Sequence, residues 1–159
     1  MLPEEWRSLR RILVIQAGSL SDIANMSAAM EQLQRSLPEA EKVLLCAPHA
    51  SRLALSLPGI AQVLVHRAIS ETGLACTTNL VENLIDVLRS EQFDAALLFP
   101  SAQSSYPLGY VCYLAGIPIR VGYSSEFGGG VFSHWFNEKD CDASSMILAE
   151  IGAAVLEVA

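Results

Sequence analysis

The sequence has few basic residues. Its 159 residues include ten lysines and arginines against seventeen aspartates and glutamates, so the net charge is −7. A nucleic-acid-binding domain needs a basic stripe to displace counterions, and this deficit therefore argues against DNA or RNA as a partner. One basic cluster, Arg7, Arg10 and Arg11 beside Trp6, is interpreted either as a peripheral membrane contact or as a solvated lead-in to the first strand.

Long hydrophobic runs are absent as well. Hydrophobic residues make up 52% of the chain, but they are divided into runs much shorter than the roughly 20 residues of a membrane span. The N-terminus, "MLPEEWRSLRR", carries two acidic residues and does not resemble a secretory signal. We therefore expect one globular domain over residues 1–159, without a membrane span and located in the cytoplasm.

Cysteines are few and widely spaced. The four cysteines, at positions 46, 76, 112 and 141, form no pair with the spacing of zinc ligands. Cys46 and Cys112 fall inside apolar segments and are predicted to be small buried hydrophobic residues. We predict neither a disulfide nor a structural metal.

The pattern that is present is an alternation of strands and helices. Continuous apolar runs predict strands over residues 11–16, 42–47, 62–66, 94–99 and 119–123. Helical periodicity predicts helices over 22–37, 48–57, from a cap at Thr78-Asn79, from 104 to 116, and over 142–151. This order predicts an α/β three-layer, Rossmann-like parallel sheet of about five strands in the order 3-2-1-4-5.

Ligands of such sheets bind at the carboxyl ends of the strands, and the first loop there is "AGSLSD". It contains Gly18 but neither G-x-G-x-x-G nor a Gly-Lys-Ser/Thr phosphate loop. Asp22 has two interpretations. In the first, Ser21 is the N-cap and Asp22 stabilises the helix dipole. In the second, Asp22 is a general base within reach of a bound hydroxyl.

Several segments, taken in order, resemble the N-terminal half of the family 9 glycosyltransferases, the heptosyltransferase family of lipopolysaccharide synthesis. The matching segments are "ILVIQAGSLSD", "LQRSLPEAEKVLLCAP", "LSLPGIAQVLVH", "LIDVLRSEQFDAALLFPSAQSS", "YLAGIPIRVGY" and the late Ile151-Gly152. The resemblance covers nearly the whole chain from Arg11.

The resemblance implies one half of a GT-B architecture, in which this domain holds a sugar or glycolipid acceptor. A second domain, expected to be absent from this chain, would hold the nucleotide-sugar donor, which is a co-substrate; no cofactor is implied. Asp22 occupies the place of the base that deprotonates the acceptor hydroxyl for an inverting transfer. The candidate acceptor-binding residues are Gly18, Ser19, Ser21, Ser101, Gln103, Ser104 and Arg120.

Two departures from the family favour an alternative. Ser21 stands where the family has glycine, and Gln16 stands where it commonly has a basic residue. These differences fit a non-catalytic binding or scaffold module that retains the fold. Without a donor domain we expect the chain by itself to be inactive, and the face that such a domain would cover leaves a homodimer open.

Overall fold

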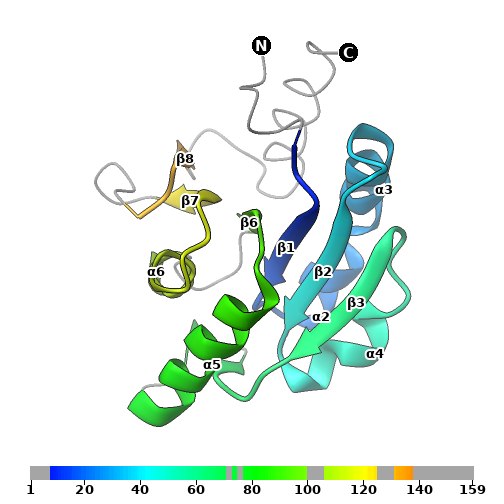
Figure 1. Cartoon of the computed structure of the whole chain (residues 1–159). Helices are drawn as coiled ribbons and strands as arrows, with labels where there is room; N and C mark the ends of the chain where they lie inside the picture. The colour runs from blue at the N-terminus through cyan, green and yellow to red at the C-terminus, as the bar shows by residue number, and fades with distance from the viewer. Residues whose placement is uncertain (1–7, 71–72, 75–76, 100–105, 125–130, 138–159) are drawn as a thin grey trace.

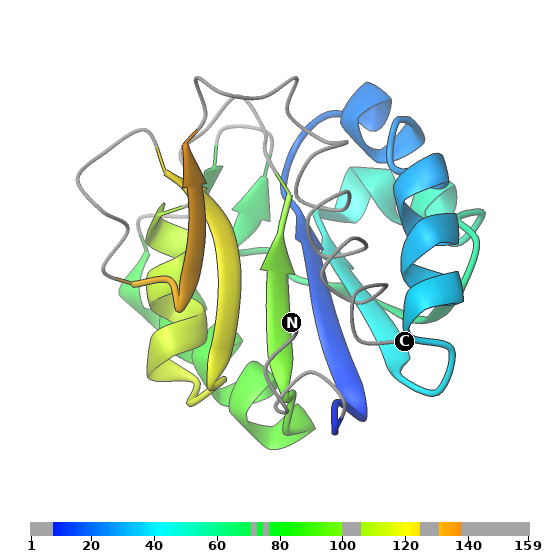
Figure 2. The same cartoon turned by 90° about the horizontal axis from the view of Figure 1, so that it is seen from above.

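A parallel sheet of six strands lies at the centre of the protein. The computed structural model describes residues 8–70, 73–74, 77–99, 106–124 and 131–137. The strand order is β3-β2-β1-β6-β7-β8, and Figure 2 shows β8 in orange at one edge with β1 in blue inside the sheet. The first five strands of this order confirm the predicted order 3-2-1-4-5, with β6 and β7 as the fourth and fifth.

The strands of the sheet are β1 (Arg11–Gln16), β2 (Glu41–Cys46), β3 (Ile60–Val65), β6 (Ala95–Leu98), β7 (Ile119–Ser124) and β8 (His134–Asn137). A small antiparallel hairpin consists of β4 (Ile69–Ser70) and β5 (Gly73–Leu74). The helices are α2 (Leu20–Ala24), α3 (Ser27–Ser36), the 3-10 turn η1 (Pro48–Ala50), α4 (Ser51–Ala54), α5 (Thr78–Glu91) and α6 (Tyr106–Leu114). Among these described helices, none has both the length and the apolar character to cross a bilayer. The helix predicted over 142–151 lies outside the described residues.

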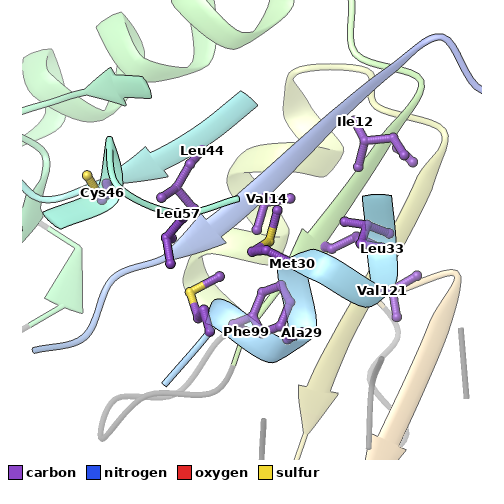
Figure 3. Close-up of a cluster of buried hydrophobic side chains, with 14 of the residues drawn as sticks. Ile12, Val14, Ala29, Met30, Leu33, Leu44, Cys46, Leu57, Phe99 and Val121 are labelled. Carbon is purple, nitrogen blue, oxygen red and sulfur yellow. The ribbon is translucent and has the colours of Figure 1, made fainter. Parts of the chain in front are cut away.

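Both faces of the sheet are covered, which explains why the strand sequences are continuously apolar. Side chains alternate along β1, so Ile12 and Val14 join one buried cluster while Leu13 and Ile15 join another on the opposite face. Figure 1 shows α3 and α4 on one side of the sheet and α5 and α6 on the other. Figure 3 shows the first cluster, in which Met30 of α3 lies among side chains from the strands. The result is the predicted three-layer α/β arrangement.

The helix predicted over 22–37 is two helices. The chain turns at Asn25 and Met26, where the Met26 N–H donates to the Ile23 carbonyl at 3.1 Å. Asparagine is a weak helix former, and this turn keeps the apolar side chains in phase. The predicted stripe is therefore buried across the break, through Ile23, Met26, Met30 and Leu33.

The third of the predicted helices begins slightly earlier than expected. The sequence predicts a cap at Thr78-Asn79, but α5 begins at Thr78 with Thr77 as its N-cap and no side-chain cap bond. The Val81 N–H already donates to the Thr77 carbonyl at 3.2 Å, so Asn79 lies inside the first turn. The buried face of α5 includes Leu84 and Leu88.

Strand β8 lies beyond the five predicted strands, the last of which covers residues 119–123. It pairs in parallel with β7, and nine residues, 125–133, join the two strands. This connection is shorter than the usual crossover of a dozen or more residues. Phe132, at its end, is buried against Gly109 of α6 and Gly122 of β7. A Cβ on Gly109 would lie 2.5 Å from Phe132 Cε1, so only glycines leave room for the ring here.

We expect Gly122→Ala to lower the free energy of unfolding by about 1–3 kcal/mol, the usual cost of overpacking a core. The added methyl group would overlap the Phe132 ring. Urea denaturation of Gly122→Ala, Phe132→Leu and the double variant forms a mutant cycle. The smaller side chain at 132 should recover part of the loss, and strictly additive effects would contradict this contact.

Charged side chains hold the start of the first strand in place at the amino end of the sheet. The Asp94 carboxylate accepts from the Arg10 and Arg11 N–H groups at 2.7 and 2.9 Å. The Arg11 guanidinium pairs with Glu91 at 2.8 Å and Glu41 at 3.5 Å, and it stacks on the Phe93 ring. Arg11 is thus engaged in contacts within the fold; Trp6 and Arg7 lie outside the described residues.

Lys42 of β2 is a buried cation. It is 1% exposed, and its Nζ donates to Gln34 Oε1 at 2.8 Å and to the carbonyl of Leu37, the residue that ends α3. Within the described residues no carboxylate pairs with it. Burial lowers the pKa of Lys42 from its ordinary 10.5, because removal from water disfavours the charged form.

This pKa shift predicts a rise of stability with pH. Between the lowered pKa and about 10.5, the unfolded chain binds more protons at Lys42 than the folded chain does, so the free energy of unfolding increases there. Below the lowered pKa this residue contributes no pH dependence. Urea unfolding of the natural protein and of Lys42→Met, from pH 7 upward, should show a steeper alkaline rise in the natural protein. Parallel curves would contradict the prediction.

Candidate functional site

The sheet topology selects one crevice. From β1 the chain moves outward to β2 and β3, then returns to the other side of β1 to form β6. The carboxyl ends of β1 and β6 therefore flank the topological switch point, where open parallel sheets bind ligands. The Phe99 N–H after β6 donates to the Ile15 carbonyl at 2.9 Å and keeps these ends together. The predicted site residues Ser101, Gln103 and Ser104 follow β6 but lie outside the described residues.

The turn from β1 into α2 carries Asp22 in a capping box. Ser19, not Ser21, is the N-cap, which corrects the predicted cap. The Asp22 N–H donates to Ser19 Oγ at 3.4 Å, and Asp22 Oδ2 accepts from the Ser19 N–H at 2.9 Å and the Ser19 hydroxyl at 3.1 Å. The helix begins two residues earlier than expected because this reciprocal pair satisfies the first-turn amide groups.

The two oxygens of the Asp22 carboxylate differ. Oδ2 is held by Ser19, whereas within the described part of the chain Oδ1 has no hydrogen-bond partner. The side chain is half-buried, so Oδ1 is open to solvent or to a ligand. A carboxylate fixed through one oxygen and open at the other can accept a proton from a bound hydroxyl.

Gly18 leaves room for the Asp22 carboxylate next to the backbone. A Cβ there would overlap Asp22 Oδ2 and would lie 2.9 Å from Asp22 Cγ and 2.8 Å from Gln16 Oε1. The requirement for glycine is thus the close approach of two side chains to the Gly18 backbone. Sequence reasoning proposed Gly18 for the site but gave Gln16, which is 1% exposed, no structural part in it.

Ser21 lies in the same turn. It is exposed, and its Oγ lies 3.0 Å from Ser19 Oγ. Gly18, Ser19, Ser21 and Asp22 therefore form one cluster at the carboxyl end of β1, which we call the β1–α2 turn.

Arg120 is not brought to this turn. It is the second residue of β7, in register with Ala96 of β6, near the amino ends of the strands. Its guanidinium donates to the carbonyls of Val131 and Ile117, each at 2.6 Å, and stacks on the Tyr113 ring. The described contacts make Arg120 a link between α6, β7 and the start of β8, and we leave it out of the proposed acceptor site.

Two histidines lie outside the β1–α2 turn. His66 accepts the Ala68 N–H on Nδ1 at 3.0 Å, and its Nε2 lies 2.8 Å from Asn83 Oδ1 of α5. His49 is exposed on η1 after β2.

Two cysteines are buried thiols, as predicted. Cys46 and Cys112 are free, and burial raises their pKa to about 11 and about 12. Thiols that stay protonated are poor nucleophiles, so neither supplies chemistry to the site. Cys76 and Cys141 lie outside the described residues.

The cap assignment predicts different effects for two neighbouring serines. Ser19→Ala removes the side-chain cap and should lower the free energy of unfolding by about 1 kcal/mol. Ser21→Ala, on the exposed face of the same turn, should change it by less than about 0.5 kcal/mol. Thermal or urea unfolding of the two variants checks the difference, and an equal or larger loss in Ser21→Ala would contradict the cap.

The comparisons with known proteins concern the fold. No protein-family model matches the chain, and no curated protein matches its sequence. The structure of E. coli ADP-heptose lps heptosyltransferase II matches with a TM-score of 0.64 and 22% identity, over 79% of this chain and 34% of that one. A glycosyl transferase family 9 structure from Veillonella parvula matches with a TM-score of 0.67 and 17% identity, over 99% of this chain and 42% of that one.

The chain therefore spans well under half the length of these two structures. The order of its strands and helices, the covering of both sheet faces and these two matches agree. The chain has the fold found in part of the heptosyltransferase and family 9 glycosyltransferase structures.

Proposed function

We propose that this chain is the acceptor-binding half of an inverting, nucleotide-sugar-dependent glycosyltransferase. The observation that carries the proposal is the position of Asp22, a half-buried carboxylate at the switch point with Oδ1 open. The likeness to a structure named as an ADP-heptose lps heptosyltransferase supports this chemistry and suggests a nucleotide-activated sugar as donor. The β1–α2 turn is then the described part of the acceptor site.

In the proposed reaction, this chain takes part in one proton transfer, through Asp22. A hydroxyl of the acceptor sugar lies against Asp22 Oδ1 and loses its proton to it as the hydroxyl oxygen attacks the anomeric carbon of the donor. The new glycosidic bond forms as the bond to the diphosphate breaks, and the nucleoside diphosphate leaves with the electron pair. Ser19 keeps Oδ2 occupied, which leaves Oδ1 as the oxygen available to the acceptor.

The donor side requires groups from elsewhere. Positioning a nucleotide sugar and stabilising the charge on its leaving diphosphate need preorganised donors or cations across a cleft. The matched structures are more than twice as long as the part that this chain covers. We therefore propose that transfer needs a second, donor-binding domain.

A non-catalytic binding module is the second candidate. One observation favours it: the capping box already gives Asp22 a structural task, because Oδ2 stabilises the first turn of α2. In that case the turn would be retained for the fold, and replacing the carboxylate would change stability without changing any transfer.

Asp22→Asn should lower kcat by about 10²–10⁴-fold, the usual contribution of a general base. Asparagine is close in size and can still accept from the Ser19 N–H, so the fold should persist. Transfer is measured on the natural protein that contains this domain, with ADP-heptose as the first donor tested. Asp86→Asn, on the exposed face of α5, is the matched control and should retain full turnover.

Acceptor binding is tested separately on the ¹⁵N-labelled chain. Titration with deacylated lipopolysaccharide core oligosaccharide should shift the amide resonances of Gly18, Ser19 and Asp22 and leave that of Asp86 in place. Full turnover in Asp22→Asn would refute Asp22 as the base. Unchanged resonances at the turn would refute the acceptor site there.

A further inference from the structure

Gln16 is a buried polar residue at the end of an interior strand. It is 1% exposed and pairs in register with Cys46 of β2 at the carboxyl edge of the sheet. Its side-chain Oε1 accepts from the Gly18 N–H at 2.8 Å. A buried amide is retained in a core only when its polar atoms are bonded, so this contact fixes both the side chain and the turn.

Gln16 and Asp22 act on consecutive amide groups. Gln16 Oε1 takes the Gly18 N–H, and Asp22 Oδ2 takes the Ser19 N–H at 2.9 Å. Both oxygens lie on the side of Gly18 where a Cβ would stand. These two amide groups, which directly precede the first residue of α2, are therefore already bonded to side chains of this chain.

From this geometry we propose that Gln16 is a positioning residue for Asp22. Its bond to the Gly18 N–H sets the course of the backbone between β1 and α2. That course brings the Asp22 carboxylate over Gly18, with Oδ2 on Ser19 and Oδ1 toward the acceptor. The inference rests on the proposed function, because positioning has a catalytic meaning only where Asp22 is the base.

The chemistry of glutamine suits this position. A methionine of similar length would leave the buried Gly18 N–H without an acceptor, and the turn would have to open toward water to satisfy it. A lysine would place a charge beside the Asp22 carboxylate and pair with it, which would hold the carboxylate in its ionised form. Glutamine bonds the turn and brings no charge.

The first measurement is structural and does not depend on transfer. In Gln16→Met, amide hydrogen exchange at Gly18 should become faster and the Asp22 resonances should move. The control is Gln62→Met, the same change at an exposed position of β3, which should leave both unchanged. Unchanged exchange at Gly18 in Gln16→Met would overturn the inference.

The second measurement is kinetic and uses the natural protein that contains this domain, well below the unfolding transition of every variant. Gln16→Met should lower kcat by roughly 10²-fold, the effect of misplacing a catalytic group by about 1 Å, while KM for ADP-heptose stays close to that of the natural protein. A loss of stability without a loss of kcat would identify a purely structural role and overturn the inference.

The two proposals fail in distinguishable ways. If Asp22→Asn retains turnover, the proposed function fails and the catalytic meaning of Gln16 fails with it. If Asp22→Asn loses turnover while Gln16→Met retains it, the proposed function stands and the inference about Gln16 is wrong. Loss in both variants, with full turnover in Gln62→Met, is the expected result.

Discussion

The parallel pairing of β1 with β2 on one side and β6 on the other is the constraint on which the rest of the structure depends. It buries β1 on both faces and joins its side chains to both hydrophobic clusters. The chain continues to β2 on one side of β1 and later returns to form β6 on the other side, so the carboxyl end of β1 lies at the topological switch point. The turn after Gln16 therefore opens into the crevice of the sheet. The location of the candidate site therefore follows from the strand order, before any side chain is considered.

Most of the fold could be predicted because the apolar patterns are strong. Continuous runs such as "RILVIQ" predict buried parallel strands, and Gly116, in the left-handed conformation with φ +80°, ends α6 as its sequence indicated. What could not be predicted depends on local turns and distant contacts. The break at Asn25 leaves the periodicity intact, so the sequence pattern contains no sign of it. Strand β8 depends on pairing with β7 and on the contacts of Phe132 with two glycines far apart in sequence.

For the candidate site, the sequence indicates the turn after the first strand but not the local contacts within it. An acidic residue after a Gly/Ser loop at the end of a strand indicates Asp22, but spacing cannot distinguish Ser19 from Ser21 as the cap, since both are good cap residues. For Arg120, the sequence suggests a role that its contacts in the structure do not support. A cation in an apolar strand suggests an anion-binding role, yet three-dimensional neighbours supply carbonyls and an aromatic ring instead. A single sequence does not reveal the contact that Gln16 makes, because its partner is the backbone amide of Gly18.

The packing of Phe132 has a consequence for how this part of the chain can vary. One aromatic ring lies against both α6 and β7 at the end of a connection too short for a full crossover helix. A larger residue at 109 or 122 needs a smaller one at 132, and a smaller residue at 132 leaves a cavity unless the glycines grow. Among homologous chains these three positions should therefore change jointly, as a covarying set. Chains that place a longer segment between the two strands are released from that restriction.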